Sequence, residues 1–320
     1  MKALVTAEFT DDGMRRLTAL GYDVTRAGWG VTHQPLEPHE LIAAAIGAAL
    51  ILTEIEVIDR NLLAAVPELA LVGTARGGPA NVDLAACAER GLPVLYTPGR
   101  NAESVADFTI GLLLALVRQL PAAEQHLRTE GWLVGHELPY LHFRGPELAG
   151  LTLGLVGCGA VGRRVAQRAR DGFGMQVRFT DPQVDGSVPL AELLSASDIL
   201  SLHCPRTPET SHLIDAAALA LMRPGSYLIN TAGGDVVDQQ ALVAALTDGH
   251  LAGAALDVFG TEPLPRDDPL LSAPGLLLTP HLAGAAYDVV RHHTGLLCDD
   301  VERWHRGEPL RHQASASAAR

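Results

Sequence analysis

Short apolar runs alternate with amphipathic stretches along most of the chain, and this alternation predicts an architecture of strands and helices. In the first part of the chain, such runs predict strands over residues 2–6, 23–27, 48–53, 70–74 and 93–97. The stretches between them predict helices over residues 11–20, 38–46, 60–66 and 82–90. This βα alternation implies a small parallel sheet that is covered by helices on both faces.

A long apolar stretch separates this part from the rest. Residues 103–120 predict one buried connecting helix, which is expected to end at Pro121. Residues 130–148 form an irregular segment rich in aromatic residues and histidine. A surface loop is one interpretation of this segment, and an interface or lid is the other.

From residue 150 the alternation resumes, and it predicts a doubly wound parallel sheet with ligand crevices at the carboxyl ends of its strands. The predicted strands cover residues 153–156, 175–180, 198–203, 226–230, 252–258 and 276–279. The predicted helices cover residues 163–170, 190–195, 216–222 and 239–247. A last amphipathic helix, residues 288–306, can cross back to cover the first part of the chain.

The composition narrows the classes of protein. With 320 residues and 48% hydrophobic content, the chain can fill two ordinary cores. Its net charge of −13 argues against nucleic acid and an anionic membrane as partners. There is no signal-peptide pattern, the apolar run at 109–117 is too short for a bilayer, and residues 311–320 resemble a disordered end. Four scattered cysteines lack any zinc spacing and predict reduced thiols in a cytoplasmic protein without a metal site: Cys87, Cys158, Cys204 and Cys298.

The strongest chemical signal follows the strand predicted at 153–156. Gly157, Gly159 and Gly162 have the spacing G-x-G-x-x-G and lead into a helix. This arrangement gives a tight turn, a close approach of backbone to a pyrophosphate, and a helix amino end that faces the phosphates. The sequence therefore predicts a dinucleotide site.

An acidic residue refines this prediction. Asp181 ends the next predicted strand, at the distance expected of an acid that binds the ribose 2′-hydroxyl. Its carboxylate would repel a 2′-phosphate, so NAD is favoured over NADP. Arg178 and Arg206 lie near enough in the sequence to leave NADP as an alternative.

A candidate acid–base pair stands at two later strand ends. Glu262 follows the strand that ends near Asp257, and His281 follows the last predicted strand. A carboxylate against an imidazole fixes its tautomer and favours its protonated form, so His281 could exchange a proton with a substrate oxygen near neutral pH. Hydride transfer to a carbonyl group needs such a proton partner.

Together these motifs resemble the D-isomer-specific 2-hydroxyacid dehydrogenases, whose members include phosphoglycerate, glycerate and formate dehydrogenases. The likeness covers nearly the whole chain. The matching stretches are residues 155–162 (LVGCGAVG), 203–205 (HCP) with Thr210, 253–259 (GAALDVF), 262–264 (EPL), 279–284 (TPHLAG), 76–83 (RGGPANVD) and 97–103 (TPGRNAE).

The resemblance implies an α/β fold with two domains. Residues 1–101 and 285–320 would form a smaller, flavodoxin-like substrate domain, and residues 102–284 a Rossmann NAD-binding domain. The resemblance also implies an active-site cleft between the domains and a homodimer formed through the NAD domain.

The same resemblance assigns roles to residues. His281 would be the general acid/base and Glu262 its partner. The backbone of Gly77 and Gly78 would face the substrate carboxylate, and Arg76 and Asn101 are further candidates for substrate binding. The cofactor would be bound by Gly157, Gly159, Ala160, Val161, Gly162, Asp181, His203, Cys204, Pro205, Thr210, Thr231, Ala232, Gly233, Asp257, His281 and Gly284.

One position departs from the family pattern. After Asn-Thr-Ala the family has an arginine that binds the substrate carboxylate, and this chain has Gly233 there, followed by Gly234 and Asp235. Three interpretations stay open. Another cation serves, with Arg76 the first candidate and Arg100 the second; or the substrate is not an ordinary 2-keto acid; or turnover is lost, naturally or through an engineered change.

The sequence thus predicts an NAD-dependent oxidoreductase acting at C2 of a small 2-hydroxy or 2-keto acid, or of an anionic analogue such as a phosphonate. The alternative is an NAD-binding sensor or scaffold without turnover. The intact pair of His281 and Glu262 argues against the alternative, whereas Gly233 argues for it.

Overall fold

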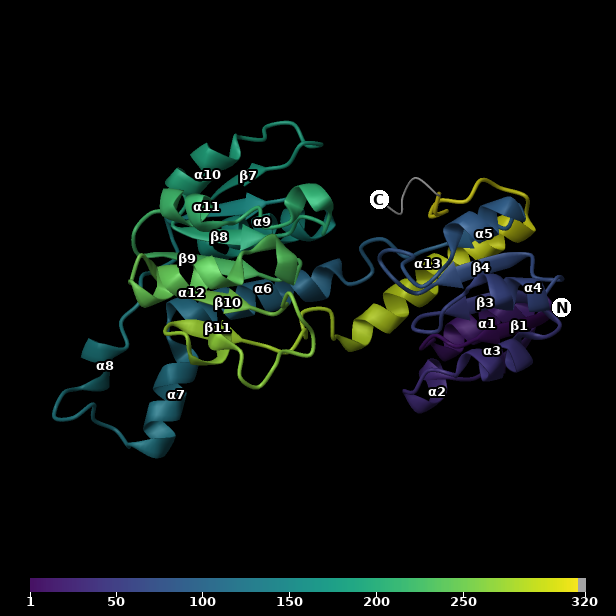
Figure 1. The fold of residues 1–320 in the computed structure, drawn as a ribbon, viewed down its shortest axis with the longest axis horizontal. Helices are drawn as coiled ribbons and strands as arrows, with labels where there is room; N and C mark the ends of the chain where they lie inside the picture. The colour runs from purple at the N-terminus through teal and green to yellow at the C-terminus, as the bar shows by residue number, and fades with distance from the viewer. Residues whose placement is uncertain (316–320) are drawn as a thin grey trace. The chain divides into compact units, whose positions relative to one another are not determined.

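The computed structural model describes residues 1–315 and divides the chain into two compact units (Figure 1). Unit 1 joins Met1–Asn101 to the chain from Ala285 onward, and unit 2 is Ala102–Gly284. Each unit is built around its own sheet.

The sheet of unit 1 has the strand order β2-β1-β3-β4-β5, and all neighbouring strands run parallel. The strands are β1 (Lys2–Val5), β2 (Asp23–Arg26), β3 (Ala48–Thr53), β4 (Leu71–Thr74) and β5 (Val94–Leu95). The central strands are almost entirely buried, as expected of parallel strands covered on both faces. The five predicted strands are confirmed, with ends that differ by at most two residues.

The helices of unit 1 begin at side-chain caps. Thr10, Asp59 and Asp83 each accept a backbone N–H from the first turn of the helix that follows. The helices are α1 (Asp11–Ala19), α2 (Trp29–Thr32), α3 (Pro38–Ala45), α4 (Arg60–Ala65), α5 (Leu84–Glu89) and α13 (Tyr287–His305).

Two apolar clusters hold these helices against the sheet. One cluster packs α3, α4 and α5 on one face. The other packs α1 and α13 on the opposite face, where Leu297, Cys298 and Val301 of α13 are at most 1% exposed. The prediction that the last helix returns to cover the first part of the chain is therefore confirmed.

The expectation of a disordered end is wrong for the residues that follow α13. Asp300 is 1% exposed and accepts the backbone N–H groups of Arg311 and His312 at 2.7 and 3.0 Å. Gln313 then bridges Leu95 of β5 in the antiparallel sense. A buried carboxylate thus fixes this segment, and residues 316–320 lie outside the described residues.

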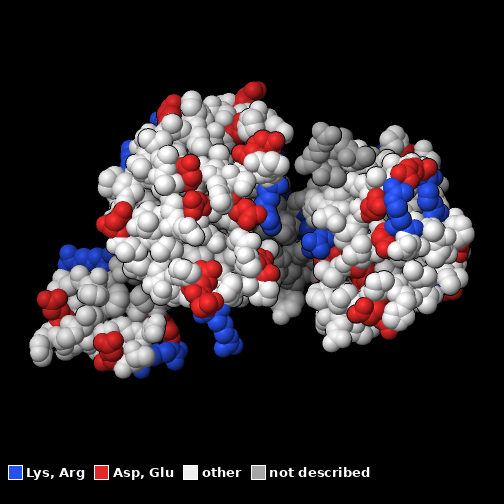
Figure 2. All heavy atoms as spheres, in the orientation of Figure 1, with Lys and Arg blue, Asp and Glu red and all other residues white. Residues whose placement is uncertain are grey.

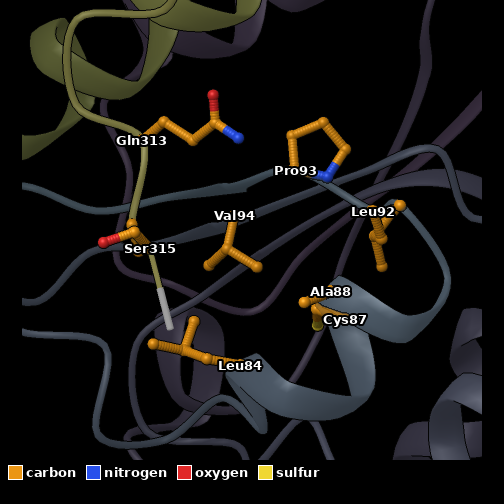
Figure 3. Close-up of a pocket in the computed structure, with 10 residues that line it drawn as sticks. Leu84, Cys87, Ala88, Leu92, Pro93, Val94, Gln313 and Ser315 are labelled. Atoms are coloured by element: carbon orange, nitrogen blue, oxygen red, sulfur yellow. The ribbon is translucent and has the colours of Figure 1, made fainter. Parts of the chain in front are cut away.

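A cavity of about 470 Å³ lies between α5 and this C-terminal segment (Figure 3). Its lining includes Val94, Leu84 and Gln313 and has no charged side chain. Burial raises the pKa of the Cys87 thiol there to about 11, so the thiol stays protonated and unreactive at neutral pH.

The sheet of unit 2 has the strand order β11-β10-β9-β8-β6-β7, again with parallel neighbours throughout. The strands are β6 (Thr152–Val156), β7 (Gln176–Thr180), β8 (Ile199–Leu202), β9 (Ser226–Asn230), β10 (Leu251–Leu256) and β11 (Leu276–Leu278). The chain passes from β6 to β7 on one side and returns with β8 on the other. The predicted doubly wound, Rossmann-type sheet is confirmed, and its switch point lies at β6.

Helices cover both faces of this sheet. One face carries α6 (Ala102–Val117) and α9 (Ala160–Phe173), and the other carries α10 (Leu190–Ala196), α11 (Ala216–Leu221) and α12 (Gln239–Thr247). Short 3-10 helices follow several strand ends: η1 (Pro208–Thr210), η2 (Gly234–Val236) and η3 (Pro269–Ser272).

The prediction of one helix ending at Pro121 is wrong. Helix α6 ends at Val117, Gln119 takes a left-handed conformation with φ of 52°, and α7 (Leu120–Thr129) starts with Pro121 in its first turn. A proline costs little in the first turn of a helix, because the N–H that it lacks would have no partner there.

Residues 120–143 form an arm that projects from the body of unit 2 (Figure 1). Helix α7 buries none of its residues, and the segment predicted to be irregular also contains the short α8 (Pro139–His142). The arm exposes seven large apolar side chains: Leu120, Leu127, Trp132, Leu133, Leu138, Tyr140 and Leu141.

Within the described residues, no helix by itself has the length and apolar character needed to cross a membrane. The pair α6 and α7 has enough of both, but the two helices are bent by 57° at their junction. Acidic side chains are scattered over the face shown in Figure 2, and basic ones stand among them in small groups.

Candidate active site

The glycine turn after β6 is shaped by contacts that leave no room for side chains. Gly157 has φ of +94°, and a Cβ there would lie 2.7 Å from the backbone of His203 and Cys204. A Cβ at Gly162 would lie 2.2 Å from the carbonyl oxygen of Gly157. By contrast, nothing lies within 4 Å of a Cβ at Gly159, which begins α9 without a side-chain cap. The turn therefore presents open backbone N–H groups at a helix amino end.

Asp181 follows β7 and closes this turn. Its Oδ2 accepts the N–H of Cys158 at 2.8 Å, and its Oδ1 accepts the N–H of Gln183 at 2.9 Å. Arg178 is paired with Glu192 at 3.2 Å, and Arg206 is paired with an aspartate of another loop. Arg178 is thus engaged, and the carboxylate of Asp181 would repel a 2′-phosphate, which favours NAD.

The loop after β9 is organised by Asn230, which is 1% exposed. Its Oδ1 accepts the N–H of Ala232 at 3.0 Å, and its Nδ2 donates to the carbonyl of Gly233 at 2.9 Å. Thr231 is held by the hydroxyl of Thr109 on α6 at 3.1 Å. Asn230 is not among the predicted site residues, although a polar residue at the end of a buried strand is a signal that its side chain stabilises the following loop.

The side chains of His281 and Glu262 are in contact, as the sequence predicts. Nδ1 of His281 lies 2.7 Å from Oε2 of Glu262, whose Oε1 accepts the N–H of Phe259 at 2.9 Å. The imidazole is 62% exposed and the carboxylate 36% exposed. His281 also has φ of +55°, a left-handed conformation that is uncommon for residues other than glycine.

Burial raises the pKa of Glu262, but the hydrogen bonds from His281 and from the N–H of Phe259, with the charges of His281 and Arg206, outweigh burial and hold that pKa below its usual value. Glu262 is therefore ionised at neutral pH. A carboxylate at Nδ1 favours the tautomer with the proton on Nδ1, which leaves Nε2 of His281 as the reactive nitrogen. Within the described residues, Nε2 has no hydrogen-bond partner.

A cavity of about 660 Å³ opens beside this pair. It is lined by Glu262, His281 and Thr279 and by an apolar wall: Phe259, Pro263, Leu264, Leu271, Leu278 and Pro280. A site of this kind, apolar with a few polar groups, is typical of small-molecule binding.

In unit 1, the loop after β4 carries Arg76, Gly77 and Gly78, and the loop after β5 carries Arg100 and Asn101. Gly77 and Gly78 are open, with nothing within 4 Å of a Cβ at either position. Nη1 of Arg76 reaches only the carbonyl of Glu54, at 3.5 Å, and in the described part of the chain it has no acidic partner. Arg100 is instead engaged, with Glu54 at 2.7 Å and with Nδ1 of His293 at 2.9 Å. Asn101 is the last residue of this part of unit 1.

Comparison with known proteins agrees with this site. Residues 110–283, more than half of the chain, match the NAD-binding domain of the D-isomer specific 2-hydroxyacid dehydrogenases. The chain belongs to this family. The dehydrogenase is 39% identical over 261 residues to a glyoxylate reductase of Korarchaeum cryptofilum, covering 78% of this chain and 77% of the relative. It is 41% identical over 274 residues to an (S)-sulfolactate dehydrogenase of Chromohalobacter salexigens, covering 82% and 86%.

Solved structures agree. The dehydrogenase superposes on the TT0316 protein of Thermus thermophilus with a TM-score of 0.83 and 35% identity, over 98% of this chain and all of that chain. The comparisons and the glycine turn together make the protein an NAD-dependent enzyme that acts on a CH–OH group.

Other predicted cofactor residues of the dehydrogenase lie in the segment that follows β8. Part of His203 is exposed, but its Nδ1 is buried and lacks a partner in the described part of the chain, and burial lowers the pKa of His203 to about 3. The imidazole is therefore neutral and bonds to Ser201 at 2.9 Å. Burial likewise raises the pKa of Cys204 to about 11. Pro205 accepts the hydroxyl of Thr210 at 2.7 Å, which braces the loop that follows.

Asp257, a predicted cofactor residue, accepts several hydrogen bonds from the protein itself. Asp257 is completely buried, and its oxygens accept the hydroxyl of Thr279 at 2.6 Å and the N–H groups of Leu282 and Ala283 at 2.8 Å. These bonds shape the loop that carries His281 and ends at Gly284. Binding of the cofactor by Asp257 stays a prediction, whereas its hydrogen bonds show that it stabilises this loop.

All four cysteines are unpaired and buried. Across residues 1–315, no group of three or more His, Cys, Asp and Glu side chains could hold a metal ion.

Proposed function

We propose that this dehydrogenase transfers a hydride between C4 of nicotinamide and C2 of a small 2-hydroxy or 2-keto acid, with His281 and Glu262 as its proton relay. The observation that carries this proposal is the 2.7 Å contact between Nδ1 of His281 and the carboxylate of Glu262, beside an open cavity. When bound, the cofactor would supply the hydride as NADH or accept it as NAD⁺, and the residues of the chain handle the proton.

The relay works through Nε2 of His281. In the reducing direction Nε2 donates a proton to the developing alkoxide, and in the oxidising direction it accepts the proton of the hydroxyl. Glu262 is ionised and stabilises the imidazolium while it exists. The left-handed backbone of His281, fixed by the contacts of Asp257 with its neighbours, sets the position of the imidazole.

The cofactor would lie on the glycine turn, and the residues present there fit it. The open N–H groups at Gly159, Ala160 and Val161 suit a pyrophosphate, and Asp181 suits a ribose hydroxyl. The rest of the proposed cofactor set is unchanged from the sequence: Gly157, Gly162, His203, Cys204, Pro205, Thr210, Thr231, Ala232, Gly233, Asp257, His281 and Gly284.

The substrate is proposed to be a small anion. One relative is named for glyoxylate and another for sulfolactate, an acid with a second anionic group. A phosphonate analogue remains within this proposal for the same reason. Arg76 lacks an acidic partner among the residues described and is a candidate for binding such a group, together with Gly77, Gly78 and Asn101.

We also propose a homodimer in the cytoplasm. The apolar side chains exposed on the arm, residues 120–143, form a surface of the kind that a second copy of the chain covers. The four unpaired cysteines suit a reducing compartment.

The test is steady-state oxidation of NADH, and separately of NADPH, with glyoxylate, hydroxypyruvate, pyruvate, phosphonopyruvate and sulfopyruvate. We expect turnover with at least one of these acids and a preference for NADH. The rival function, a sensor that binds NAD without turnover, is favoured only by the absence of a cation at Gly233. Tight NADH binding without turnover of any acid would favour that rival.

A further inference from the structure

Gly233 is not required by its backbone. Its φ of −166° and ψ of 139° are extended values that any residue adopts. A side chain here would instead displace Arg206, because a Cβ at this position would lie 2.3 Å from Cγ and 2.7 Å from Cδ of Arg206. The side chain of Arg206 therefore occupies the volume that a side chain at position 233 would need.

The base of Arg206 is held by a rigid turn. Arg206 stands between Pro205 and Thr207 at the end of β8, and Thr207 starts η1 with a reciprocal cap. The hydroxyl of Thr210 donates to the carbonyl of Pro205 at 2.7 Å and accepts the N–H of Thr207 at 2.9 Å. The direction in which Arg206 leaves the backbone is thus fixed before any ligand binds.

The far end of Arg206 is held as well. Its Nη2 bonds to Oδ2 of Asp235, and the two side chains are 61% and 40% exposed. Guanidinium has five N–H donors, and in the described chain no other acceptor bonds to those of Arg206. A cation with open donors remains available to an anion.

This cation belongs to the same site as the relay. The loop of Gly233 packs on the loop of Glu262, because a Cβ at Gly234 would lie 1.8 Å from the carbonyl carbon of Phe259. The N–H of Phe259 in turn donates to Glu262. The charge of Arg206 reaches Glu262 as well: burial raises the pKa of that carboxyl, and Arg206 is among the charges that lower it.

We propose that Arg206, reaching over Gly233, is the cation that binds the carboxylate of the substrate, and that Asp235 is the positioning residue that holds its guanidinium. This inference rests on the proposed function only for the identity of the substrate. Gly233 and Arg206 then act together: because position 233 has no side chain, the cation from the end of the neighbouring strand β8 can occupy that space.

The pairing with Asp235 has a consequence for affinity. An arginine that shares its charge with a carboxylate attracts a second carboxylate less strongly than an unpaired one would. Asp235→Asn keeps an oxygen that can accept from Arg206 but removes the opposing charge. The KM for the acid is therefore expected to fall in Asp235→Asn, whereas it rises in Arg206→Gln.

The experiment measures KM and kcat for the best acid of the panel, and the Kd of oxalate for the complex of the protein with NADH. Oxalate has the carboxylate but cannot accept a hydride, so its binding reports the anchor without turnover. In Arg206→Gln we expect KM and the oxalate Kd to rise about 10- to 100-fold, the worth of one or two charge-assisted hydrogen bonds. The Kd of NADH should not change.

Two variants at position 233 sharpen the test. Gly233→Ala suits the extended backbone but displaces Arg206 without supplying a cation, so it should raise KM about as much as Arg206→Gln. The exchange of sites, Arg206→Ala with Gly233→Arg, should restore a KM within about fivefold of wild type, since a cation again stands over the loop. A purely structural role of Arg206 would not be rescued in this way.

Arg223→Gln is the matched control. Arg223 is also a half-exposed arginine of unit 2, is paired with Asp198 at 2.7 Å, and lies before β9 rather than after a strand end of the site. It should leave KM and oxalate binding unchanged. Arg76→Ala is measured beside it, and a loss confined to Arg76→Ala would overturn the proposal and assign the anchor to unit 1.

The outcomes separate the two proposals. Equal oxalate affinity in wild type and Arg206→Gln, or a neutral Gly233→Ala, overturns the anchor while leaving the dehydrogenase activity intact. Arg206-dependent binding of oxalate without turnover of any acid supports the anchor and rejects the proposed activity. Both proposals are overturned if wild type neither binds oxalate nor turns over any acid.

Discussion

Among the described residues, two pairs of a histidine and a carboxylate lie within 3 Å of each other, one pair in each unit. In unit 2, His281 meets Glu262 at 2.7 Å, and in unit 1, His312 meets Asp300 at 2.9 Å. The pair in unit 2 is exposed and beside a cavity. In the other pair the carboxylate is 1% exposed and also accepts two backbone N–H groups.

The comparison teaches that the pair of residue types does not make a proton relay. The oxygens of Asp300 accept hydrogen bonds that hold the C-terminal segment against α13, so its pair with His312 is structural. One oxygen of Glu262 accepts the N–H of Phe259, and the other bonds to Nδ1 of His281. Nε2 of His281 has no hydrogen-bond partner in the described chain. The two pairs therefore differ in how many of their polar atoms already have partners within the protein.

The largest expected effect comes from His281→Asn. Asparagine tolerates the left-handed backbone of this position but cannot relay a proton. We expect kcat to fall about 10²- to 10⁴-fold with little change in Tm. The measurement is steady-state NADH oxidation with the best acid.

The chain offers a matched control for that variant. His212 is also an exposed histidine of unit 2 with positive φ, 49°, and its imidazole belongs to neither pair. His212→Asn should keep kcat within about twofold, inside the scatter expected of a surface substitution. A similar loss in both variants would attribute the effect to the backbone and remove His281 from the relay.

The next effect is on stability. Asp300→Ala leaves the N–H groups of Arg311 and His312 without their buried acceptor. The free energy of unfolding is expected to fall by about 1–3 kcal/mol, with kcat per folded molecule unchanged. Urea denaturation followed by circular dichroism measures it, and a loss of kcat at full folding would show that this pair is not purely structural.

A smaller change should follow His312→Ala. It removes one hydrogen bond to Asp300, while both backbone bonds stay in place. We expect a loss of about 0.5–1.5 kcal/mol in the free energy of unfolding. If His312→Ala destabilised the protein more than Asp300→Ala does, the backbone bonds would not be what Asp300 contributes.

The smallest effect concerns the pH dependence of stability. The pKa of Glu262 is below its ordinary value of 4.5, because the bonds from His281 and Phe259 outweigh burial, which raises it. Its contribution to stability is therefore present above pH 4.5 and is lost as the pH falls through the lower, folded-state pKa. Glu262→Gln should flatten the acid side of a plot of Tm against pH, by a modest amount since the group is partly exposed. A wild-type slope in this variant would contradict the assignment.

The strands, the glycine turn and the pair of Glu262 and His281 could be predicted from the sequence, because each depends on residues that are close in sequence or at the ends of neighbouring strands. Apolar periodicity located the strands, and the spacing of Gly157, Gly159 and Gly162 located the turn, since such glycines act on their immediate neighbours. The pair of Glu262 and His281 could be inferred because parallel strands bring their carboxyl ends to one edge.

What escaped prediction depends on side chains that are distant in sequence. Arg206 fills the space over Gly233, and Asp300 fixes residues that by composition resemble a disordered end. The helix break at Gln119 was missed for another reason, because Pro121 is compatible with both the end of a helix and the first turn of a new one. Composition and spacing carry no information on which side chain occupies a given volume.

The most direct test of the account is a single turnover. The protein is loaded with one equivalent of NADH, mixed with the best acid, and followed by NADH absorbance, in wild type and in His281→Asn. We expect loss of the absorbance in wild type and a transfer at least about 100-fold slower in His281→Asn, with the same NADH affinity. Equal rates in the two proteins, or no transfer in wild type with any acid, would contradict it.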